Sequence, residues 1–409
     1  MGKGVFMETI RFLHTADLHL DSPFKGMAAA GPDELARLQQ STFAAFDRFI
    51  AYAVEQRPDF IVIVGDIYDG EDRSLRAQIR FQQAMQRLEE AHIPVFLSYG
   101  NHDHLAGNWT RVSLPKNVHV FSDSVEQQQL TVRGETITIH GFSYPQRHVK
   151  EPMIADYKIA GDDGIHIGLL HGSVAGDSAH AVYAPFTVSE LRQKNYHYWA
   201  LGHIHKRQVL AQQPPIVYPG NIQGRHRNEQ GVKGFYDVTL SREQANTTFV
   251  PTSAIVFTAL TISCQGIEYA DDWVAACQEA IDGVVAELGS IIIELVMTDT
   301  EDLADNLQRA ASESEWLDIL REQYVMNEPF VWITTIDWQF SSTSESPNTL
   351  LEPVVDTIVS WQLEDWDELM SELYSHRAGR YLERLTLNDR EQLKQQATAL
   401  LAAEWLKEG

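Results

Sequence analysis

Short apolar runs alternate with segments of helical periodicity in the first part of the chain. Compact runs at 10–15, 60–64 and 94–98 predict strands, because they are too short to be helices. Apolar positions recur every three or four residues at 33–55 and 75–91, which predicts two amphipathic helices. A strand–helix–strand–helix–strand order predicts parallel strands joined by right-handed crossovers.

Beyond Asn117 the pattern changes to short strands separated by turn-rich segments. The expected strands cover 118–121, 136–140, 166–170, 198–201, 216–218 and 235–240. A second sheet that packs on the first would bury their apolar faces. The predicted fold class is therefore α/β, with a two-sheet β-sandwich flanked by helices.

The character of the sequence changes again near Ser253. The expected elements are strands at 254–263, 290–297 and 330–338 and helices at 271–288 and 303–324. Together they predict a small α+β accessory unit. None of its residues forms a catalytic signature.

A polar, structure-breaking segment at 341–348 is expected to be a linker. Helical patterns follow it at 350–363, 366–385 and 389–406. These helices could dock on the body of the protein or on a partner, and the sequence favours neither. The predicted domains are 1–250, 251–340 and 341–409.

The composition of the chain is that of a globular protein. The chain has 409 residues, of which 44% are hydrophobic, as expected for a globular protein that buries a sizeable core. No apolar run approaches the roughly 20 residues that cross a bilayer, and residues 1–11 lack the features of a signal peptide. The two cysteines, Cys264 and Cys277, form neither a disulfide framework nor a zinc ribbon. A cytoplasmic protein without membrane contact is predicted.

The net charge of -25 argues against a nucleic-acid enzyme, because phosphate contacts normally require Lys and Arg. Its distribution removes that objection. Residues 1–245 contain 24 basic and 27 acidic residues, whereas residues 246–409 contain 8 and 30. The acidity therefore lies in the last part of the chain, and fifteen of the sixteen histidines lie in the first. The two parts are expected to have different roles.

Five short polar signatures occur in order, each where a predicted strand ends. They are Asp17-Leu-His19, Gly65-Asp66-Ile-Tyr-Asp69, Gly100-Asn101-His102-Asp103, His171-Gly172 and Gly202-His203-Ile-His205. Ligands of open α/β sheets gather beyond the carboxyl ends of the strands. The five signatures are therefore expected to converge on one site.

The residue types suit divalent metal ions. Carboxylate, imidazole and amide oxygen without thiolate favour Mn²⁺, Fe²⁺ or Zn²⁺, with Mg²⁺ as a further alternative. The i, i+2 spacing of Asp17 and His19 is expected to put both side chains on one side of an extended segment, and the same holds for His203 and His205. Glycines at 65, 100 and 202 are expected to let the backbone turn sharply. Two ions about 3.5–4 Å apart, sharing a carboxylate, would clamp a phosphate.

Each signature alone has a structural explanation. An Asp-x-His pair can be a hydrogen-bonded strand end, a Gly-Asn-His-Asp run can be a tight turn, and a single histidine is more often structural than a ligand. The ordered occurrence of all five at strand ends favours a metal centre over five unrelated structural features.

The ordered set resembles the calcineurin-like metallophosphoesterase superfamily. The stretch HTADLHLDSPF at 14–24 resembles more closely the SbcD-type DNA repair exonucleases, and within them the bacterial YhaO group. The segments at 65–73 and 218–226 support this resemblance, which covers about residues 10–240. It implies a metallophosphoesterase fold over 1–250, a capping domain over 251–340, and C-terminal helices that meet a partner.

The resemblance also implies roles for individual residues. Asp17, His19 and His205 would hold one ion, Asn101, His171 and His203 the other, and Asp66 would bridge them. His102 matches the family's histidine beside the scissile phosphate, which protonates the leaving oxygen or stabilises charge in the transition state.

Several neighbours of these residues have open roles. Asp103 could orient a histidine or stabilise its turn. Asp69 and His104 are polar neighbours of the site, and His14 is expected to form structural hydrogen bonds. The loop PGNIQGRH at 219–226 departs from better-studied SbcD-type nucleases, which carry a serine-rich turn there. In it, Arg225 and the adjoining His226 and Arg227 could contact a phosphate backbone or form a solvated basic loop.

Three hypotheses for the function follow. The first is a Mn²⁺-dependent DNA phosphodiesterase, for which the resemblance implies a homodimer working with a coiled-coil ATPase of the SbcC or YhaN type. The second is a phosphatase or phosphodiesterase that acts on a nucleotide or another small phosphoester, since the same ligands serve both. The third is a scaffold with a relic metal site, against which the complete ligand set argues.

Overall fold

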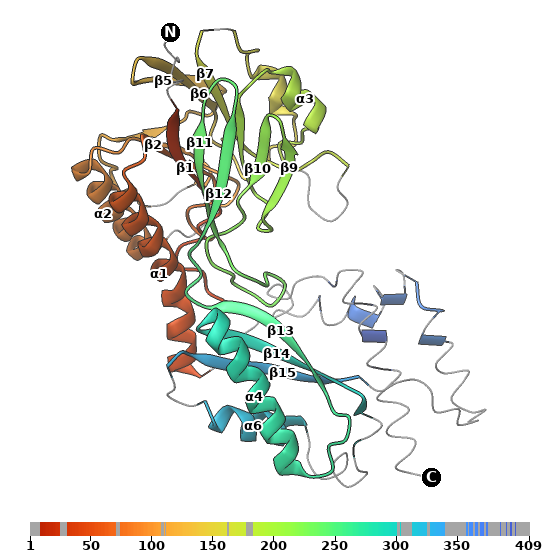
Figure 1. Ribbon diagram of the computed structural model, residues 1–409. Coiled ribbons are helices and arrows are strands. Elements are labelled where there is room, and N and C mark those ends of the chain that lie inside the picture. The colour runs from red at the N-terminus through yellow and green to blue at the C-terminus, as the bar shows by residue number, and fades with distance from the viewer. Residues whose placement is uncertain are drawn as a thin grey trace, which may run out of the picture. The chain divides into compact units, whose positions relative to one another are not determined.

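The computed structural model describes most of the chain up to Trp338 and less of the remainder (Figure 1). The described residues are 9–24, 31–70, 74–107, 110, 112–161, 163–176, 183–300, 303, 313–324 and 328–339, with single residues and short runs between 357 and 397. Two compact units divide the chain, Met1–Phe340 and Ser341–Gly409. The first unit contains three sheets.

The first sheet has six strands in the order β12-β11-β1-β2-β3-β4. Their bounds are β1 Ile10–Ala16, β2 Phe60–Val64, β3 Val95–Ser98, β4 Val118–Val120, β11 Gly234–Leu240 and β12 Ala245–Pro251. Strands β1 to β4 are parallel, and β11 is antiparallel to β1 and β12. Helices α1 (Pro32–Gln56) and α2 (Leu75–Glu90) connect the first three strands. This arrangement confirms the predicted βαβ order.

The second sheet also has six strands, in the order β5-β6-β7-β8-β10-β9. Their bounds are β5 Glu126–Val132, β6 Glu135–Gly141, β7 Ile165–His171, β8 Tyr198–Gly202, β9 Gln208–Gln212 and β10 Pro215–Tyr218. Strands β6, β7, β8 and β10 are parallel, and the edge strands β5 and β9 are antiparallel to their neighbours. The short helices η1 (Met153–Asp156) and α3 (Val188–Gln193) precede β7 and β8.

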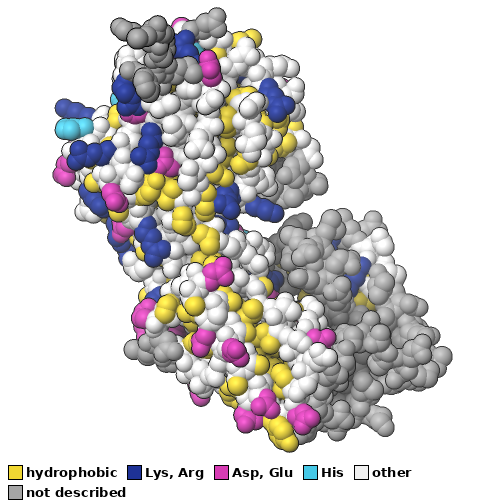
Figure 2. Space-filling view, in the orientation of Figure 1, with side chains coloured by type: hydrophobic (Ala, Val, Ile, Leu, Met, Phe, Trp, Pro, Cys, Tyr) yellow, Lys and Arg dark blue, Asp and Glu magenta, His cyan; other side chains and the backbone are white. Residues whose placement is uncertain are grey.

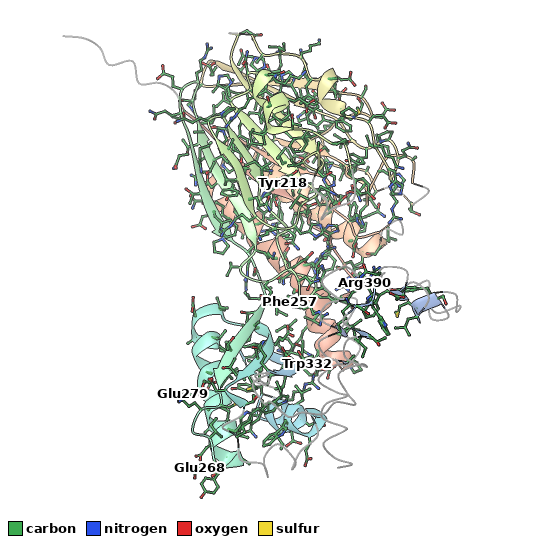
Figure 3. All side chains as sticks on the ribbon, turned by 90° about the vertical axis from the view of Figure 1, so that its right-hand side faces the viewer. Tyr218, Phe257, Glu268, Glu279, Trp332 and Arg390 are labelled. Atoms are coloured by element: carbon green, nitrogen blue, oxygen red, sulfur yellow. The ribbon has the colours of Figure 1, made fainter. Side chains whose placement is uncertain are left out.

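The two sheets pack face to face, as the sequence predicts. In β2, Phe60, Val62 and Val64 belong to the core between the sheets, while Ile61 and Ile63 face α1 and α2. Both faces of this strand are covered, which explains why its sequence is an unbroken apolar run. Figure 1 shows α1 and α2 together on one side of the sandwich, and Figure 3 shows Tyr218 within it.

Local signals explain where the two long helices begin. Pro32 stands in the first turn of α1, where its missing N–H costs nothing, and two acidic residues follow it. The Ser74 side chain accepts a hydrogen bond from the Ala77 backbone N–H and caps α2. Each helix then runs back along the sheet and brings the chain to the next strand.

A third sheet of three parallel strands forms a separate layer with its own core. Its elements are β13 Val256–Ser263, α4 Ala270–Leu288, β14 Ile291–Thr298, α6 Glu313–Glu322 and β15 Val331–Trp338. Trp273, Cys277 and Leu320 pack from the helices onto the apolar face of the sheet. Figure 2 shows acidic side chains gathered over this region, and Glu268 and Glu279 are labelled there in Figure 3. The predicted capping unit is thus an acidic layer of strands and helices.

Three strands of the structure are not predicted from the sequence. They are β5, β9 and β12, all at sheet edges. In β5 the residues alternate between partly buried and exposed, and its sequence EQQQLTV is largely polar. An edge strand that covers the core with one face needs few apolar residues, so the apolar-run criterion does not detect it.

Only some of the elements predicted beyond residue 300 fall on residues that the structure describes. Within the helix expected at 303–324, Glu313–Glu322 is helical and forms α6, whereas Leu303, Gln323 and Tyr324 are not helical. The linker at 341–348 lies outside the described residues. Most of the helices expected at 350–363, 366–385 and 389–406 also lie outside them. Two helix ends there were also placed too late: Trp361 and Gln362 are not helical, and neither is Leu385. The Gln362 backbone N–H donates to the Asp365 carboxylate at 2.6 Å, a contact typical of a helix start.

Among the described helices, none has an apolar stretch long enough to span a bilayer.

Candidate metal centre

The five polar signatures meet at one edge of the sandwich. Asp17 and His19 follow β1, Asp66 follows β2, Asn101 follows β3, His171 ends β7, and His203 and His205 follow β8. The loops after β1 and β2 run side by side, because the His19 and Leu20 N–H groups donate to the Asp66 and Ile67 carbonyls. The predicted convergence at the strand ends is therefore present.

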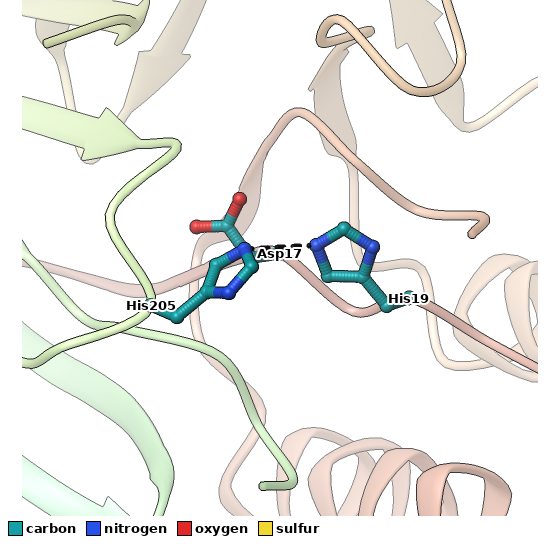
Figure 4. Close-up of side chains that lie close together, drawn as sticks. All are labelled: Asp17, His19 and His205. Carbon is teal, nitrogen blue, oxygen red and sulfur yellow. Dashed lines mark hydrogen bonds between the residues drawn. The ribbon is translucent and has the colours of Figure 1, made fainter. Parts of the chain in front are cut away.

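The first group of side chains consists of Asp17, His19 and His205, and it could hold a metal ion (Figure 4). The Nε2 atoms of His19 and His205 face each other at 3.1 Å. The His203 backbone N–H donates to both oxygens of the Asp17 carboxylate, at 3.0 and 3.1 Å. We call these residues the Asp17 group.

A second group consists of Asp66, His171 and His203 and could likewise hold a metal ion. His171 Nε2 lies 3.4 Å from Asp66 Oδ2 and 3.0 Å from Asn101 Oδ1. Asp66 Oδ2 also lies 3.9 Å from His19 Nε2. The Asp66 carboxylate therefore faces a histidine of each group, which is the position of a bridging ligand. We call these residues the Asp66 group.

His102 lies beside both groups with 30% of its side chain exposed. Its ring is perpendicular to that of His19 at a centroid distance of 5.1 Å. The Gly70 backbone N–H donates to His102 Nδ1 at 3.3 Å, so the proton of the neutral ring is on Nε2. This residue is placed to donate a proton towards solvent and substrate.

Asp69 lies among the charged groups at this edge. Its Oδ1 is 3.6 Å from His19 Nδ1, from His102 Nδ1 and from Arg225 Nη1, and Ser22 Oγ donates to its other oxygen at 2.9 Å. Burial alone would raise the pKa of Asp69, but the contacts with His19 and Arg225 bring it below the usual range. Asp69 is therefore an ionised neighbour of both histidines.

Asp103 ties two loops of the site together. Its Oδ2 accepts from the Ile67 N–H at 2.7 Å, and its Oδ1 accepts from the Gly100 N–H at 2.6 Å. Ile67 follows the proposed bridging residue and Gly100 precedes Asn101. Both contacts join the Asp103 carboxylate to backbone N–H groups, so they fit the predicted role in stabilising the turn.

The backbone around the ligands is not extended, so that part of the prediction was wrong. Asp17, His19, Asp66 and His203 have φ values of 51°, 42°, 51° and 99°. Non-glycine residues rarely adopt this left-handed region, and such strain clusters at functional sites. The side chains of Asp17 and His19 converge because the chain coils at the strand end.

Two of the three glycines, Gly100 and Gly202, act differently from the prediction. Only Gly65 has a positive φ, of 76°. A Cβ atom on Gly100 would lie 2.3 Å from Asp66 Oδ1 and 2.7 Å from His171 Nε2, and one on Gly202 would lie 2.0 Å from the Val64 carbonyl oxygen. Glycine is needed at 100 and 202 because the backbone passes directly beside the buried histidine and its partners.

His14 is structural, as predicted. It is fully buried, with Nδ1 3.0 Å from the Tyr198 hydroxyl and Nε2 3.2 Å from the Leu201 carbonyl oxygen. Burial lowers its pKa to about 3. His104, left open by the sequence, is also buried.

The sequence left two roles open for the basic residues of the loop after β10: contact with a phosphate backbone, or a solvated loop. His226 and Arg227 are exposed, as in a solvated basic loop. Arg225 is not: its side chain is 11% exposed, and its Nη2 lies 3.1 Å from His205 Nδ1. The Arg225 guanidinium is therefore part of the site, next to the Asp17 group.

Glu229 is a residue of the site that sequence reasoning missed. It is buried, and its Oε1 lies 2.7 Å from His205 Nδ1. No motif marks it, since it stands alone in a turn-rich segment. The signal available was the unusual loop at 218–226 that departs from the family and leads into it.

Electrostatics distinguish the two buried histidines of the site. Burial lowers the pKa of His171, but the Asp66 and Asp17 carboxylates outweigh it and raise the pKa to about 9. Burial, and then the charge of Arg225, lower the pKa of His19 to about 3. His19 is thus a neutral imidazole, the form that binds metal ions.

The donor set fits divalent cations. Two buried carboxylates, Asp17 and Asp66, share one site, and burying such charges is costly unless they are paired or bind metal. The His171 Nδ1 lies 3.1 Å from the Val64 carbonyl oxygen, which leaves Nε2 to act as a ligand. Imidazole and carboxylate are the ligands that divalent transition metals prefer.

A family model described as calcineurin-like phosphoesterase matches residues 10–207, and a bacterial relative matches almost the whole chain. The protein belongs to the calcineurin-like metallophosphoesterase family. It is therefore a hydrolase of phosphoesters, and the family implies divalent metal ions at the site.

The bacterial relative is YhaO of Bacillus subtilis, an uncharacterized metallophosphoesterase. The two are 34% identical over 397 residues, which is 96% of this chain and 97% of YhaO. The DNA double-strand break repair protein Mre11 of Thermoplasma acidophilum is 26% identical over 228 residues, 53% of this chain and 57% of Mre11. The resemblance predicted from the motifs is thus confirmed.

A dimetal phosphatase from Danio rerio is similar in structure at a TM-score of 0.33 and 11% identity, over 59% of this chain and 98% of that one.

Proposed function

We propose that this protein is a Mn²⁺-dependent DNA phosphodiesterase, an exonuclease or endonuclease of DNA repair. One observation carries the proposal: the Asp17 and Asp66 groups adjoin through the Asp66 carboxylate, and His102 lies at their exposed side. Two cation sites next to a proton donor are what hydrolysis of a phosphodiester requires.

Seven side chains would hold two ions. Asp17, His19 and His205 would hold one, Asn101, His171 and His203 would hold the other, and Asp66 would be shared by both. When bound, the two ions supply positive charge to the phosphate and lower the pKa of water for the attack. The same ligand set accepts Fe²⁺, Zn²⁺ or Mg²⁺, and Mn²⁺ is the proposed physiological ion.

His102 donates the proton that the leaving oxygen needs. Its Nδ1 accepts from the Gly70 N–H, so Nε2 carries the proton of the neutral ring. The Asp69 carboxylate lies 3.6 Å from Nδ1 on the same side of the ring. His102 is thus suited to donate or to stabilise negative charge that develops on the phosphate.

The choice of DNA as substrate has two supports. The first is the similarity to Mre11, whose name states a role in DNA double-strand break repair. The second is a cluster of cations near His205, although the chain as a whole carries a net charge of -25. The cluster contains Lys206, Arg207, Arg225 and Lys233, and the charges of the first three all act on Lys233. Such a cluster can bind phosphates that flank the scissile one.

We further propose that the protein is a homodimer that works in the cytoplasm with a coiled-coil ATPase of the SbcC or YhaN type. The family resemblance supports this assembly, with the C-terminal helical region as the contact. The two cysteines of the chain, Cys264 and Cys277, are free thiols, which fits the reducing conditions of the cytoplasm.

Cleavage assays with purified protein test the proposed substrate. Labelled single-stranded and double-stranded DNA and bis-p-nitrophenyl phosphate are incubated with Mn²⁺, and with EDTA as the control. We expect Mn²⁺-dependent cleavage of DNA and of the small diester, and loss of both in EDTA. Turnover of the small diester without any DNA cleavage would instead favour the second hypothesis, a phosphoesterase acting on nucleotides or other small esters.

A further inference from the structure

The loop between β10 and β11 places a buried carboxylate behind one of the proposed ligands. Glu229 is only 5% exposed. Its Oε1 lies 2.7 Å from Nδ1 of His205, and the opposite ring nitrogen, Nε2, faces Nε2 of His19 at 3.1 Å. Glu229 and His19 therefore contact the two different nitrogens of the His205 ring. Figure 4 shows the nitrogen of His205 that faces His19.

The loop itself fixes the Glu229 carboxylate. Its Oε2 accepts from Asn221 Nδ2 at 2.7 Å and from the Arg225 backbone N–H at 2.8 Å. Its Oε1 also lies 3.2 Å from Arg225 Nη2 and 3.3 Å from His226 Nε2. A carboxylate with both oxygens engaged cannot rotate away from the His205 ring.

These contacts determine which nitrogen of His205 carries a proton. The contact of 2.7 Å between His205 Nδ1 and the Glu229 carboxylate, which only accepts hydrogen bonds, calls for a proton on Nδ1. Arg225 Nη2 lies 3.1 Å from the same nitrogen and only donates, so it competes with Glu229 for Nδ1. The shorter, charge-assisted contact with Glu229 favours the proton on Nδ1, which leaves the lone pair of Nε2 free on the side of His19. A carboxylate that orients a histidine in this way also makes it a stronger ligand.

We propose that Glu229 is a positioning residue that sets the tautomer and orientation of His205 for metal binding. The inference rests on the proposed ligand role of His205. We expect Glu229 to affect metal binding at the Asp17 group alone, because the Val64 carbonyl, and not Glu229, orients His171 of the Asp66 group. Glu229 also contacts the Arg225 guanidinium, which lies beside His205.

The loop keeps its attachments when the Glu229 charge is removed. The Gln223 side chain accepts from the Ala254 N–H at 2.8 Å and donates to the Ile255 carbonyl at 2.6 Å, and the Gly231 N–H donates to the Phe257 carbonyl at 2.8 Å. A Glu229→Gln variant is therefore expected to fold with the loop in place.

Calorimetric titration of the metal-free protein with Mn²⁺ tests the inference. For Glu229→Gln we expect the affinity of one of the two sites to fall by about 10- to 100-fold, and that of the other to stay within about twofold of the wild type. His226→Ala is the matched control, because it removes another partner of Glu229 Oε1 without touching His205; its affinities should equal those of the wild type. Unchanged affinities in Glu229→Gln would overturn the inference.

Nitrogen NMR of the wild-type protein gives a second test that needs no variant. With ¹⁵N-labelled histidine and Zn²⁺ as a diamagnetic ion, Nδ1 of His205 should carry a proton and Nε2 should show the shift of a metal-bound nitrogen. An Nδ1 without its proton would contradict the inference. Wild-type protein that binds no Mn²⁺ or Zn²⁺ would instead overturn the proposed function on which the inference rests.

Discussion

The His102→Ser variant should cleave DNA roughly 10²- to 10⁴-fold more slowly than the wild type, the range that general acid–base groups contribute. The reason is that His102 lies beside both metal groups without being needed to hold an ion. Its Nδ1 is engaged by the Gly70 N–H, and its Nε2 proton is the one available to a leaving oxygen. The variant should still bind two Mn²⁺ ions.

Two measurements check this result together: the rate of DNA cleavage at saturating Mn²⁺, and the Mn²⁺ content by atomic absorption. His119→Ser is the matched control, since His119 is an exposed histidine on β4 that no proposed ligand contacts. It should retain the wild-type rate. Cleavage by His102→Ser at the wild-type rate would remove His102 from the mechanism.

Replacing Asp66 by asparagine should lower the cleavage rate by roughly 10³-fold or more, since loss of several kcal/mol of charge stabilisation corresponds to such a factor. Asp66 Oδ2 lies 3.4 Å from His171 Nε2 and 3.9 Å from His19 Nε2, so one carboxylate faces both groups. The neutral amide removes its charge from both. Unlike Glu229→Gln, this change should weaken Mn²⁺ binding at both sites.

Titration with Mn²⁺ and a thermal melt of the metal-free variant separate metal loss from misfolding. Asp163→Asn is the control, because Asp163 pairs with His166 at 3.0 Å outside the site; both affinities should be unchanged in it. If Asp66→Asn bound two Mn²⁺ ions as tightly as the wild type, Asp66 would not be the bridging ligand.

Much of the fold could be predicted from the sequence because apolar periodicity is strong in buried elements. The strand β2 was predicted with its observed bounds, since every residue of Phe60–Val64 is buried. Edge strands such as β5 could not be predicted in this way. Their stability comes from backbone pairing to a neighbour and from one covered face, and neither leaves a run of apolar residues.

The convergence of the site could also be predicted, because parallel strands deliver the residues that follow them to one edge. The local geometry could not. The left-handed backbone at Asp17 and His19, and the close approach of His171 to Gly100 and Gly202, follow from tertiary packing. The position of Glu229 behind His205 depends on the folding of a long loop, for which no spacing rule exists.

The central claim is that seven side chains of one site hold two metal ions across which a phosphodiester is cleaved. Anomalous diffraction from crystals grown with Mn²⁺ tests it most directly. We expect two anomalous peaks roughly 3.5–4 Å apart, one at the Asp17 group and one at the Asp66 group, with the Asp66 carboxylate touching both. A single peak, no peak, or peaks away from these side chains would contradict it.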